Sequence, residues 1–173
     1  EEIDNMNKMS ENCKNLKYVI IPKAKRKITE EYPDIIVMNY IEGKKINQIP
    51  KKYHERYAKL IVKFGMVTTT IHGFTHGDLH SGNILFINDV KDTKYPYKLG
   101  IIDFGIMCNV NNKFKGMLFD LLTQIFDNPP KVSAEKILNS GIIEPNNICN
   151  ILSKEDYNNI LTIIEKIVKE TIF

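Results

Sequence analysis

Residues 76–83 read His-Gly-Asp-Leu-His-Ser-Gly-Asn, and residues 103–105 read Asp-Phe-Gly. In these two short loops Asp78 and Asn83 stand five positions apart, and Asp103 opens the second loop. Carboxylate and amide oxygens are hard ligands that hold Mg²⁺ against phosphate groups, and a carboxylate also orients an attacking hydroxyl. The two loops together therefore predict a site for phosphoryl-transfer chemistry.

The context of the two loops strengthens this prediction. An Asp-Phe-Gly tripeptide on its own arises by chance, and an aspartate before a strand is commonly a turn residue. Here a long amphipathic pattern precedes the first loop, and short apolar runs at 84–87 and 99–102 fill the interval between the loops. Loops beside short strands suit a mobile phosphate, so order and context favour a functional site over coincidence.

The segments around the loops have clear periodicities. Residues 50–72 are predicted to form an amphipathic helix that ends near Gly73, because apolar residues recur at spacings of three and four. The runs 84–87 and 99–102 are predicted to pair as a hairpin across the turn-rich segment 88–96. The helical stripe consists of Tyr53, Tyr57, Leu60, Ile61, Phe64, Thr68 and Ile71.

The N-terminal part is predicted to form a helix at 1–17 and then a short strand at 18–21, which Pro22 ends. A second buried strand is predicted at 35–38, leading into 39–43. Between the two strands lies a basic cluster, which is interpreted as a solvated loop rather than a binding patch. The cluster consists of Lys23, Lys25, Arg26 and Lys27.

The C-terminal part is predicted to be helical scaffolding without catalytic residues. A helix beyond Asn111 is expected to stop at 129–130, where two prolines follow each other, and a shorter helix is expected at 133–139. Ser153 and Asp156 resemble a capping box at the start of a last helix. The apolar face of this helix consists of Tyr157, Ile160, Leu161, Ile164, Ile167 and Val168.

Composition narrows the function classes only slightly. The 173 residues, with 43% hydrophobic and 26% charged side chains, describe an ordinary globular domain, and a net charge of +3 implies no nucleic-acid or membrane partner. Three cysteines without metal-ligand or disulfide spacing predict an intracellular, reducing compartment. Neither a signal peptide nor an apolar run of about 20 residues is present. Because the chain begins with Glu1 rather than Met, we expect a fragment or an excised domain.

The histidines permit an alternative interpretation as a zinc site. His72, His76 and His80 recur at intervals of four, which on one helix places ligands on one face. Interspersed glycines argue against an unbroken helix there, so zinc is the less favoured alternative. His76 is instead predicted to hold its loop by hydrogen bonds, and His80 to lie near the phosphates.

The catalytic-loop pattern His-x-Asp-x-His-x-Gly-Asn resembles that of kinase-like families, namely the UbiB (aarF-domain) atypical kinases and the aminoglycoside or choline phosphotransferases. The complete Asp-Phe-Gly at 103–105 and the runs 19–22 and 36–43 are similar to the UbiB family. The resemblance covers about residues 1–126. It implies an α+β, protein kinase-like fold, with a remnant of the N-lobe and the hinge at 1–43 and a mainly helical C-lobe at 44–173.

Roles for individual residues follow from this resemblance. Asp78 corresponds to the catalytic aspartate, and Asn83 and Asp103 correspond to the Mg²⁺ ligands. The nucleotide-binding residues implied for ATP are Met38, Tyr40, Ile41 and His80. Two departures stand out, because Ser81 replaces a proline in the loop and Asn39 replaces a glutamate at the hinge.

Other elements of the UbiB pattern do not occur in this sequence. It contains no glycine- or alanine-rich phosphate loop, no strand lysine to pair with the phosphates, and no Lys-x-Gly-Gln segment. The family would place all of these before Glu1. Residues 1–17 resemble the helix whose glutamate pairs with that lysine, and Glu2 and Glu11 are both candidates for the acid.

Three functions remain open. The resemblance implies first a UbiB-type atypical kinase or ATPase, dependent on ATP and Mg²⁺ and linked through its family to isoprenoid-quinone metabolism. The alternatives are a small-molecule phosphotransferase of the aminoglycoside or choline kinase type, which Gly105 disfavours, and a non-catalytic pseudokinase scaffold. The acceptor substrate is not identified, no nucleic-acid partner is expected, and membrane association rests on the family resemblance alone.

Overall fold

The computed structural model describes residues 1–140, 143 and 148–172, and divides into two compact units. The N-terminal unit comprises Glu1–Val110, and the C-terminal unit comprises Asn111–Phe173. Both helices and strands are present, so the chain is α+β as predicted. The lobe boundary expected at residue 43 falls inside the N-terminal unit and stays a prediction.

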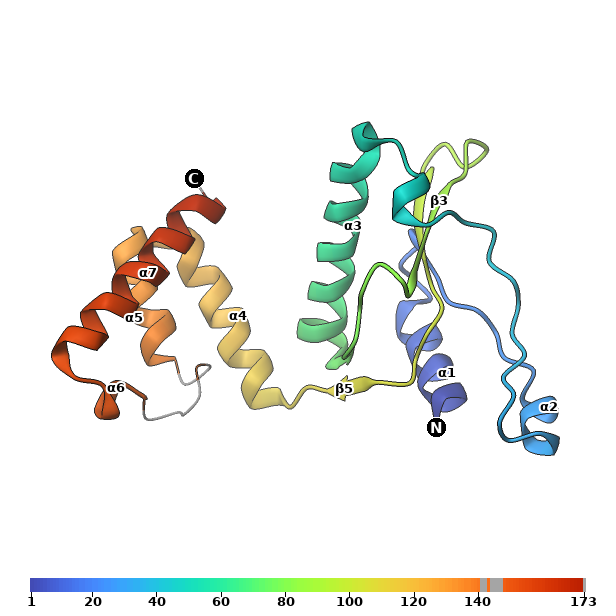
Figure 1. Ribbon diagram of the computed structural model, residues 1–173, viewed down its shortest axis with the longest axis horizontal. Coiled ribbons are helices and arrows are strands. Elements are labelled where there is room, and N and C mark those ends of the chain that lie inside the picture. Colours follow the sequence, from blue (N-terminus) through green and yellow to red (C-terminus); the bar gives the residue numbers. More distant parts are fainter. Residues whose placement is uncertain (141–142, 144–147, 173) are drawn as a thin grey trace. The chain divides into compact units, whose positions relative to one another are not determined.

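A three-stranded sheet forms the centre of the N-terminal unit (Figure 1). Its strands are β1 (Val19–Ile20), β4 (Tyr97–Ile101) and β3 (Ile84–Asn88), in that spatial order. The first pair is parallel, and β3 and β4 are antiparallel, with Ile84 opposite Ile101. The predicted hairpin is therefore confirmed, and it brings the start of β3 next to the end of β4, where the two loops lie.

The predicted helix at 50–72 is confirmed over nearly its whole length, but three types of helix follow one another within it. A 3₁₀ turn, η2 (Lys51–Tyr53), leads into α3 (His54–Met66), and a π-helical turn, η3 (Val67–His72), follows it. The Thr68 hydroxyl donates to the carbonyls of Phe64 and Gly65, and such back-bonding competes with regular helix geometry. Gly73 ends the turn at φ 63°, in the left-handed region that favours glycine.

Helices α3 and α1 (Glu2–Cys13) supply much of the core of the N-terminal unit. Tyr57 of α3 packs edge-to-face on Phe86 of β3, with ring centroids 5.0 Å apart. The predicted helix at 1–17 is confirmed over α1, because its apolar residues recur on one face. The buried residues of α1 are Ile3, Met6, Met9 and Cys13.

The strand predicted at 35–38 is wrong. Only an isolated bridge between Ala24 and Met38 forms there, and Ile35 is 51% exposed. The apolar run pairs with just the short segment 23–25, through bonds such as Lys25 N–H to the Val37 carbonyl. Part of the basic cluster is also not a loop, because α2 (Arg26–Glu31) begins within it.

A second, two-stranded sheet was not predicted. Strand β2 (Phe74–His76) pairs antiparallel with β5 (Met107–Asn109), so that His76 lies opposite Met107. One strand precedes the first loop and the other follows the second loop. This pairing brings the beginning of the first loop next to the end of the second loop.

The C-terminal unit contains α4 (Asn112–Asp127), α5 (Pro130–Asn139), α6 (Ile148–Ile151) and α7 (Lys154–Ile172). The predicted helices are confirmed, with Asn111 capping α4 and the Ser153 hydroxyl accepting the Asp156 amide at 3.1 Å. Ile167 departs from the predicted apolar face, because its side chain is 56% exposed. None of the described helices combines the length and apolar character that a membrane span needs.

Candidate functional site

The two loops lie side by side because the pairing of β2 with β5 continues into them. The Gly77 amide donates to the Ile106 carbonyl at 2.9 Å, one step beyond the pair formed by His76 and Met107. A β-carbon on Gly77 would come within 2.9 Å of the Ile106 side chain and 3.0 Å of the Cys108 sulfur. This close approach explains why glycine stands there.

His76 connects the two loops through both nitrogens of its buried ring. Its Nδ1 accepts the Asp78 amide at 3.1 Å, and its Nε2 lies 2.8 Å from the Asp103 carbonyl oxygen. An amide can only donate and a carbonyl can only accept, so the proton of the neutral ring is on Nε2. The predicted role of His76 in holding its loop agrees with these bonds.

Asn83 closes the first loop against Asp78. Its side-chain Nδ2 donates to the Asp78 carbonyl at 3.2 Å, and its backbone amide donates to the His80 carbonyl at 3.0 Å. The Asn83 carbonyl in turn accepts the Ile102 amide at 3.2 Å, which places Asn83 beside the residue before Asp103. The loop therefore brings Asn83 to the start of the second loop.

The two carboxylate oxygens of Asp103 differ in their hydrogen bonding. Oδ1 accepts the Gly105 amide at 2.9 Å, whereas Oδ2 accepts no hydrogen bond within the described ranges. The side-chain oxygen of Asn83 likewise has no donor among these residues. These carboxylate and amide oxygens, on adjoining loops, are of the hard type that Mg²⁺ prefers.

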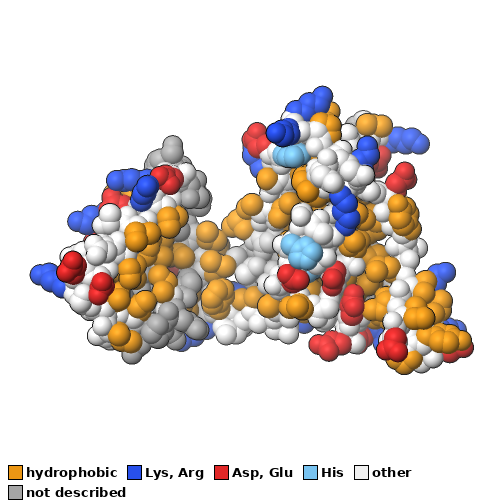
Figure 2. Space-filling view, viewed as in Figure 1, with side chains coloured by type: hydrophobic (Ala, Val, Ile, Leu, Met, Phe, Trp, Pro, Cys, Tyr) orange, Lys and Arg blue, Asp and Glu red, His pale blue; other side chains and the backbone are white. Residues whose placement is uncertain are grey.

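Asp78 and His80 face solvent next to each other. His80 Nε2 lies 3.7 Å from Asp78 Oδ2, and the side chains are 56% and 57% exposed. His80 Nδ1 accepts the Gly82 amide at 3.0 Å. Figure 2 shows exposed histidine and acidic side chains adjacent on the visible face of the N-terminal unit. The Asp78 carboxylate is thus accessible to an incoming hydroxyl.

The zinc alternative required three histidines on one helix. His72 lies in the π-helical turn, His76 ends β2, and His80 lies in the loop. No three histidine, cysteine or acidic side chains converge as metal ligands in the part of the chain that the structure describes. The structure therefore separates these histidines into three elements.

The residues predicted to contact the nucleotide base occupy different environments. Ile41 is buried, and a β-carbon on Gly100 would meet its side chain at 2.8 Å, whereas Tyr40 is 88% exposed. Met38 is half-buried and bridges to Ala24. The backbone of 40–43 forms no backbone hydrogen bonds with described residues.

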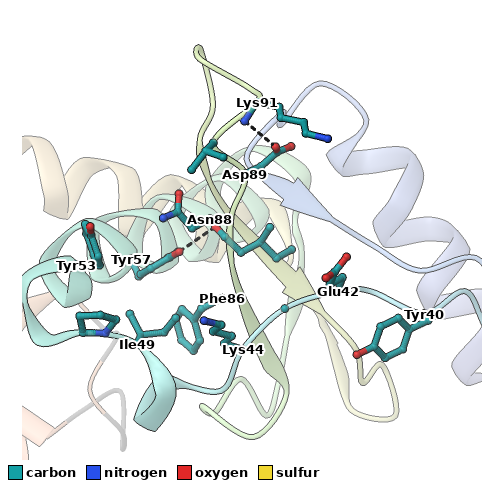
Figure 3. Close-up of a pocket in the computed structure, with 14 residues that line it drawn as sticks. Tyr40, Glu42, Lys44, Ile49, Tyr53, Tyr57, Phe86, Asn88, Asp89 and Lys91 are labelled. Atoms are coloured by element: carbon teal, nitrogen blue, oxygen red, sulfur yellow. Dashed lines mark hydrogen bonds between the residues drawn. The ribbon is translucent and has the colours of Figure 1, made fainter.

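A cavity of about 870 Å³ lies at the far end of β3 from Asn83 (Figure 3). Tyr40 and Glu42 line one side, and Tyr53 of η2 and Tyr57 of α3 line another. The Tyr57 hydroxyl donates to the Ile87 carbonyl at 2.9 Å, and burial raises the pKa of Tyr57 to about 12, with smaller effects from Tyr97 and Tyr53. Neither Asn83 nor Asp103 lines this cavity.

Helix α1 contacts the second loop directly. The Asn5 side chain donates to the Phe104 carbonyl at 2.9 Å across 99 sequence positions. Glu2 lies one turn before Asn5 on the same helix face, whereas Glu11 forms an ion pair with Lys14. Of the two candidate acids, Glu2 is therefore nearer the loop.

Sequence reasoning missed two residues of this site, Asn5 and Lys45. Lys45 Nζ donates to the Gly82 carbonyl at 2.6 Å across 37 sequence positions. Neither residue belongs to a recognisable motif, and both contacts depend on how distant segments pack. No pattern within one segment would have identified them.

Comparisons with known proteins show the family to which this chain belongs. The sequence model of the ABC1 atypical kinase-like domain matches residues 1–136. A protein of Arabidopsis thaliana named activity of bc1 complex kinase 8, chloroplastic, is 28% identical over 153 residues, which are 84% of this chain and 19% of that protein. A protein of Clostridium pasteurianum named uncharacterized protein in hydrogenase 1 5′ region is 31% identical over 131 residues, 72% of this chain and 22% of that protein.

The chain belongs to the ABC1 atypical kinase-like family, which is the UbiB family that its loops resemble. It spans about a fifth of the length of these two relatives.

Proposed function

We propose that this chain is the phosphate- and metal-handling part of an ATP-dependent atypical kinase or ATPase with a protein kinase-like fold. The bridge formed by His76 carries the proposal. Because one imidazole holds the Asp78 amide and the Asp103 carbonyl, the two loops keep a common spacing. Phosphoryl transfer requires mainly such positioning and electrostatics from a protein.

The metal ligands of this proposed site are Asn83 and Asp103. When bound, Mg²⁺ neutralises charge on the β- and γ-phosphates. The Asn83 side chain is 9% exposed, and its amide nitrogen is anchored on the Asp78 carbonyl, which turns its oxygen away from that bond. The Gly105 amide similarly orients the Asp103 carboxylate through Oδ1.

Asp78 is the catalytic residue of the proposal. Its exposed carboxylate orients the attacking hydroxyl or water and accepts its proton. His80 beside it faces the phosphates. The base of the nucleotide would lie along 38–41. Tyr40 and Ile41 would contact it through backbone groups, which form no backbone hydrogen bonds with described residues.

The remaining assignments rest on the family. Glu2 is proposed as the acid that pairs with the strand lysine of the family, because it shares a helix face with Asn5. Residues 1–43 are proposed as N-lobe remnant and hinge, and 44–173 as C-lobe. A link to isoprenoid-quinone metabolism and an association with membranes are proposed from the UbiB resemblance, and the acceptor is open.

The test is an NMR titration of the 173-residue chain with Mg-ATP up to millimolar concentration, together with an ATP hydrolysis assay. We expect weak, Mg-dependent shifts at the amides of both loops. Asp103→Asn should remove the dependence on Mg²⁺, because it weakens a metal ligand. Asp78→Asn should retain binding and lower any turnover by about 10² to 10⁴.

Asp34→Asn is the matched control, because Asp34 is an exposed carboxylate in the turn after α2. It should behave as the parent in both assays. Absence of loop shifts at saturating Mg-ATP would refute the nucleotide site. Binding without turnover in the parent would favour the pseudokinase scaffold over the enzyme.

A further inference from the structure

The side chain of Lys45 joins the segment after the hinge to the catalytic loop. Its ammonium donates to the Gly82 carbonyl at 2.6 Å. The preceding residue, Lys44, is paired with Phe86 of β3 through two backbone hydrogen bonds of 2.9 and 2.8 Å. The backbone at Lys44 is thus held against the sheet, which places the Lys45 side chain beside the loop.

Both backbone polar groups of Gly82, which belong to the two peptide planes joined at its α-carbon, form hydrogen bonds to side chains. Its carbonyl accepts from Lys45, and its amide donates to His80 Nδ1 at 3.0 Å. A β-carbon on Gly82 would meet the His80 ring at 2.6 Å, so the ring lies directly over this glycine. Together the two bonds restrict the φ and ψ angles of Gly82, so the Lys45 bond to the carbonyl also limits how the amide is presented to His80.

The orientation of Gly82 determines which nitrogen of His80 carries the proton. Because Nδ1 accepts an amide, the neutral ring is protonated on Nε2. Nε2 is also the nitrogen nearest to the Asp78 carboxylate, at 3.7 Å. The proton of His80 is therefore on the side of the ring that faces Asp78.

We propose that Lys45 is a positioning residue that acts through Gly82 to hold His80 with its Nε2 proton toward Asp78. This inference rests on the proposed function for its catalytic meaning. A nucleotide with its base along 38–41 and its phosphates at Asn83 and Asp103 crosses the space between these segments. Lys45 follows the 38–41 segment along the chain and Gly82 immediately precedes Asn83, so their hydrogen bond connects the two segments.

The test compares Lys45→Met with Lys44→Met in the 173-residue chain at one pH of about 8, where an ordinary imidazole is neutral. Lys44 is a matched control, because it is an exposed neighbour whose backbone, not its side chain, makes the sheet contact. Long-range ¹H–¹⁵N NMR reports the tautomer of His80, and hydrogen exchange reports protection of the Gly82 amide.

We expect His80 of the parent and of Lys44→Met to be protonated on Nε2. In Lys45→Met, Gly82 amide exchange should accelerate about three- to ten-fold, the range that one exposed, charge-assisted hydrogen bond supports, and His80 should become a mixture of tautomers. Lys45→Arg should restore both signals, because its guanidinium can donate to the same carbonyl.

Parent-like His80 and Gly82 signals in Lys45→Met overturn the proposal, and so does an equal change in Lys44→Met. Thermal melts of all variants show that the fold is retained. None of these readouts needs a nucleotide. A failed Mg-ATP titration would therefore count against the proposed function and leave the assignment of Lys45 standing.

Discussion

The imidazole of His76 donates to the backbone carbonyl of Asp103 at 2.8 Å, although the two residues belong to different loops. The opposite nitrogen of the same ring accepts the Asp78 amide at 3.1 Å. One buried side chain thus determines the relative position of two loop backbones, and the carboxylates they carry follow from it.

Two substitutions of His76 should each remove one of its two hydrogen bonds and keep the other. Asparagine places an acceptor near the position of Nδ1 and can keep the Asp78 bond, whereas glutamine places a donor near the position of Nε2 and can keep the Asp103 bond. Each variant should lose about 1–3 kcal/mol of unfolding free energy, because one buried partner is left unpaired. Hydrogen exchange of the Asp78 amide should remain slow in His76→Asn and become fast in His76→Gln. Equal exchange in both variants would contradict the assignment.

Two buried tyrosines should respond oppositely to loss of their hydroxyl groups. The Tyr57 hydroxyl donates to the Ile87 carbonyl, whereas the buried Tyr18 hydroxyl has no partner among the described residues. Tyr57→Phe should destabilise the chain by about 1 kcal/mol, and Tyr18→Phe should be neutral or stabilising by up to about 1 kcal/mol. Urea unfolding measures both. A similar loss for each tyrosine would show that Tyr18 has a bonded hydroxyl.

Cys13 should weaken the fold at alkaline pH. Burial raises the pKa of its thiol from 9.0 to about 11. A raised pKa contributes stability that is fully present below pH 9 and is lost as pH rises through about 11. The stability advantage of the parent over Cys13→Ala should therefore fall by roughly 2–3 kcal/mol between pH 8.5 and 11.

Cys108→Ala is the control for this measurement, because the Cys108 thiol is exposed. Its difference from the parent should stay constant over the same pH range. If the unfolding free energy of both variants differs from that of the parent with the same pH dependence, the loss of stability at alkaline pH does not come from the buried thiol of Cys13.

Lys98 should stabilise the turn after β3 only while its partners are ionised. Lys98 Nζ lies 3.0 Å from Asp89 and 2.9 Å from Asp92. The hydrogen bond from Lys98 is the main cause that lowers the pKa of Asp89 below 3.8, while the Tyr95 amide is the main cause for Asp92, followed by Lys98. Lowered pKa values contribute stability above pH 3.8 that disappears as pH falls below it.

Lys98→Met should therefore lower the melting temperature at pH 6, and the difference from the parent should shrink at about pH 3 and below. Lys91→Met is the matched control, because Lys91 is exposed and contributes only its backbone amide to Asp89. If the difference in melting temperature between Lys98→Met and the parent is the same at pH 6 and at pH 2.5, the stabilisation by Lys98 is not ionic.

Patterns of neighbouring residues were enough to predict the local elements and to single out the two loops as a candidate site. Helices α3, α4 and α7 follow from apolar spacing, and the Ser153 capping bond follows from residues three positions apart. The hairpin of β3 and β4 needed only two apolar runs and a turn. These features depend on neighbours along the chain, so their patterns are visible before folding.

The hydrogen bonds that hold the loops could not be predicted from the sequence, because they join distant segments. The bond from Asn5 to the Phe104 carbonyl spans 99 positions, and the bond from Lys45 to Gly82 spans 37. The apolar run at 35–38 failed as a strand because its available partner, 23–25, is too short for a ladder. A hydrogen bond between distant segments forms only where packing brings a donor and an acceptor together, and residue types along one segment do not specify that meeting.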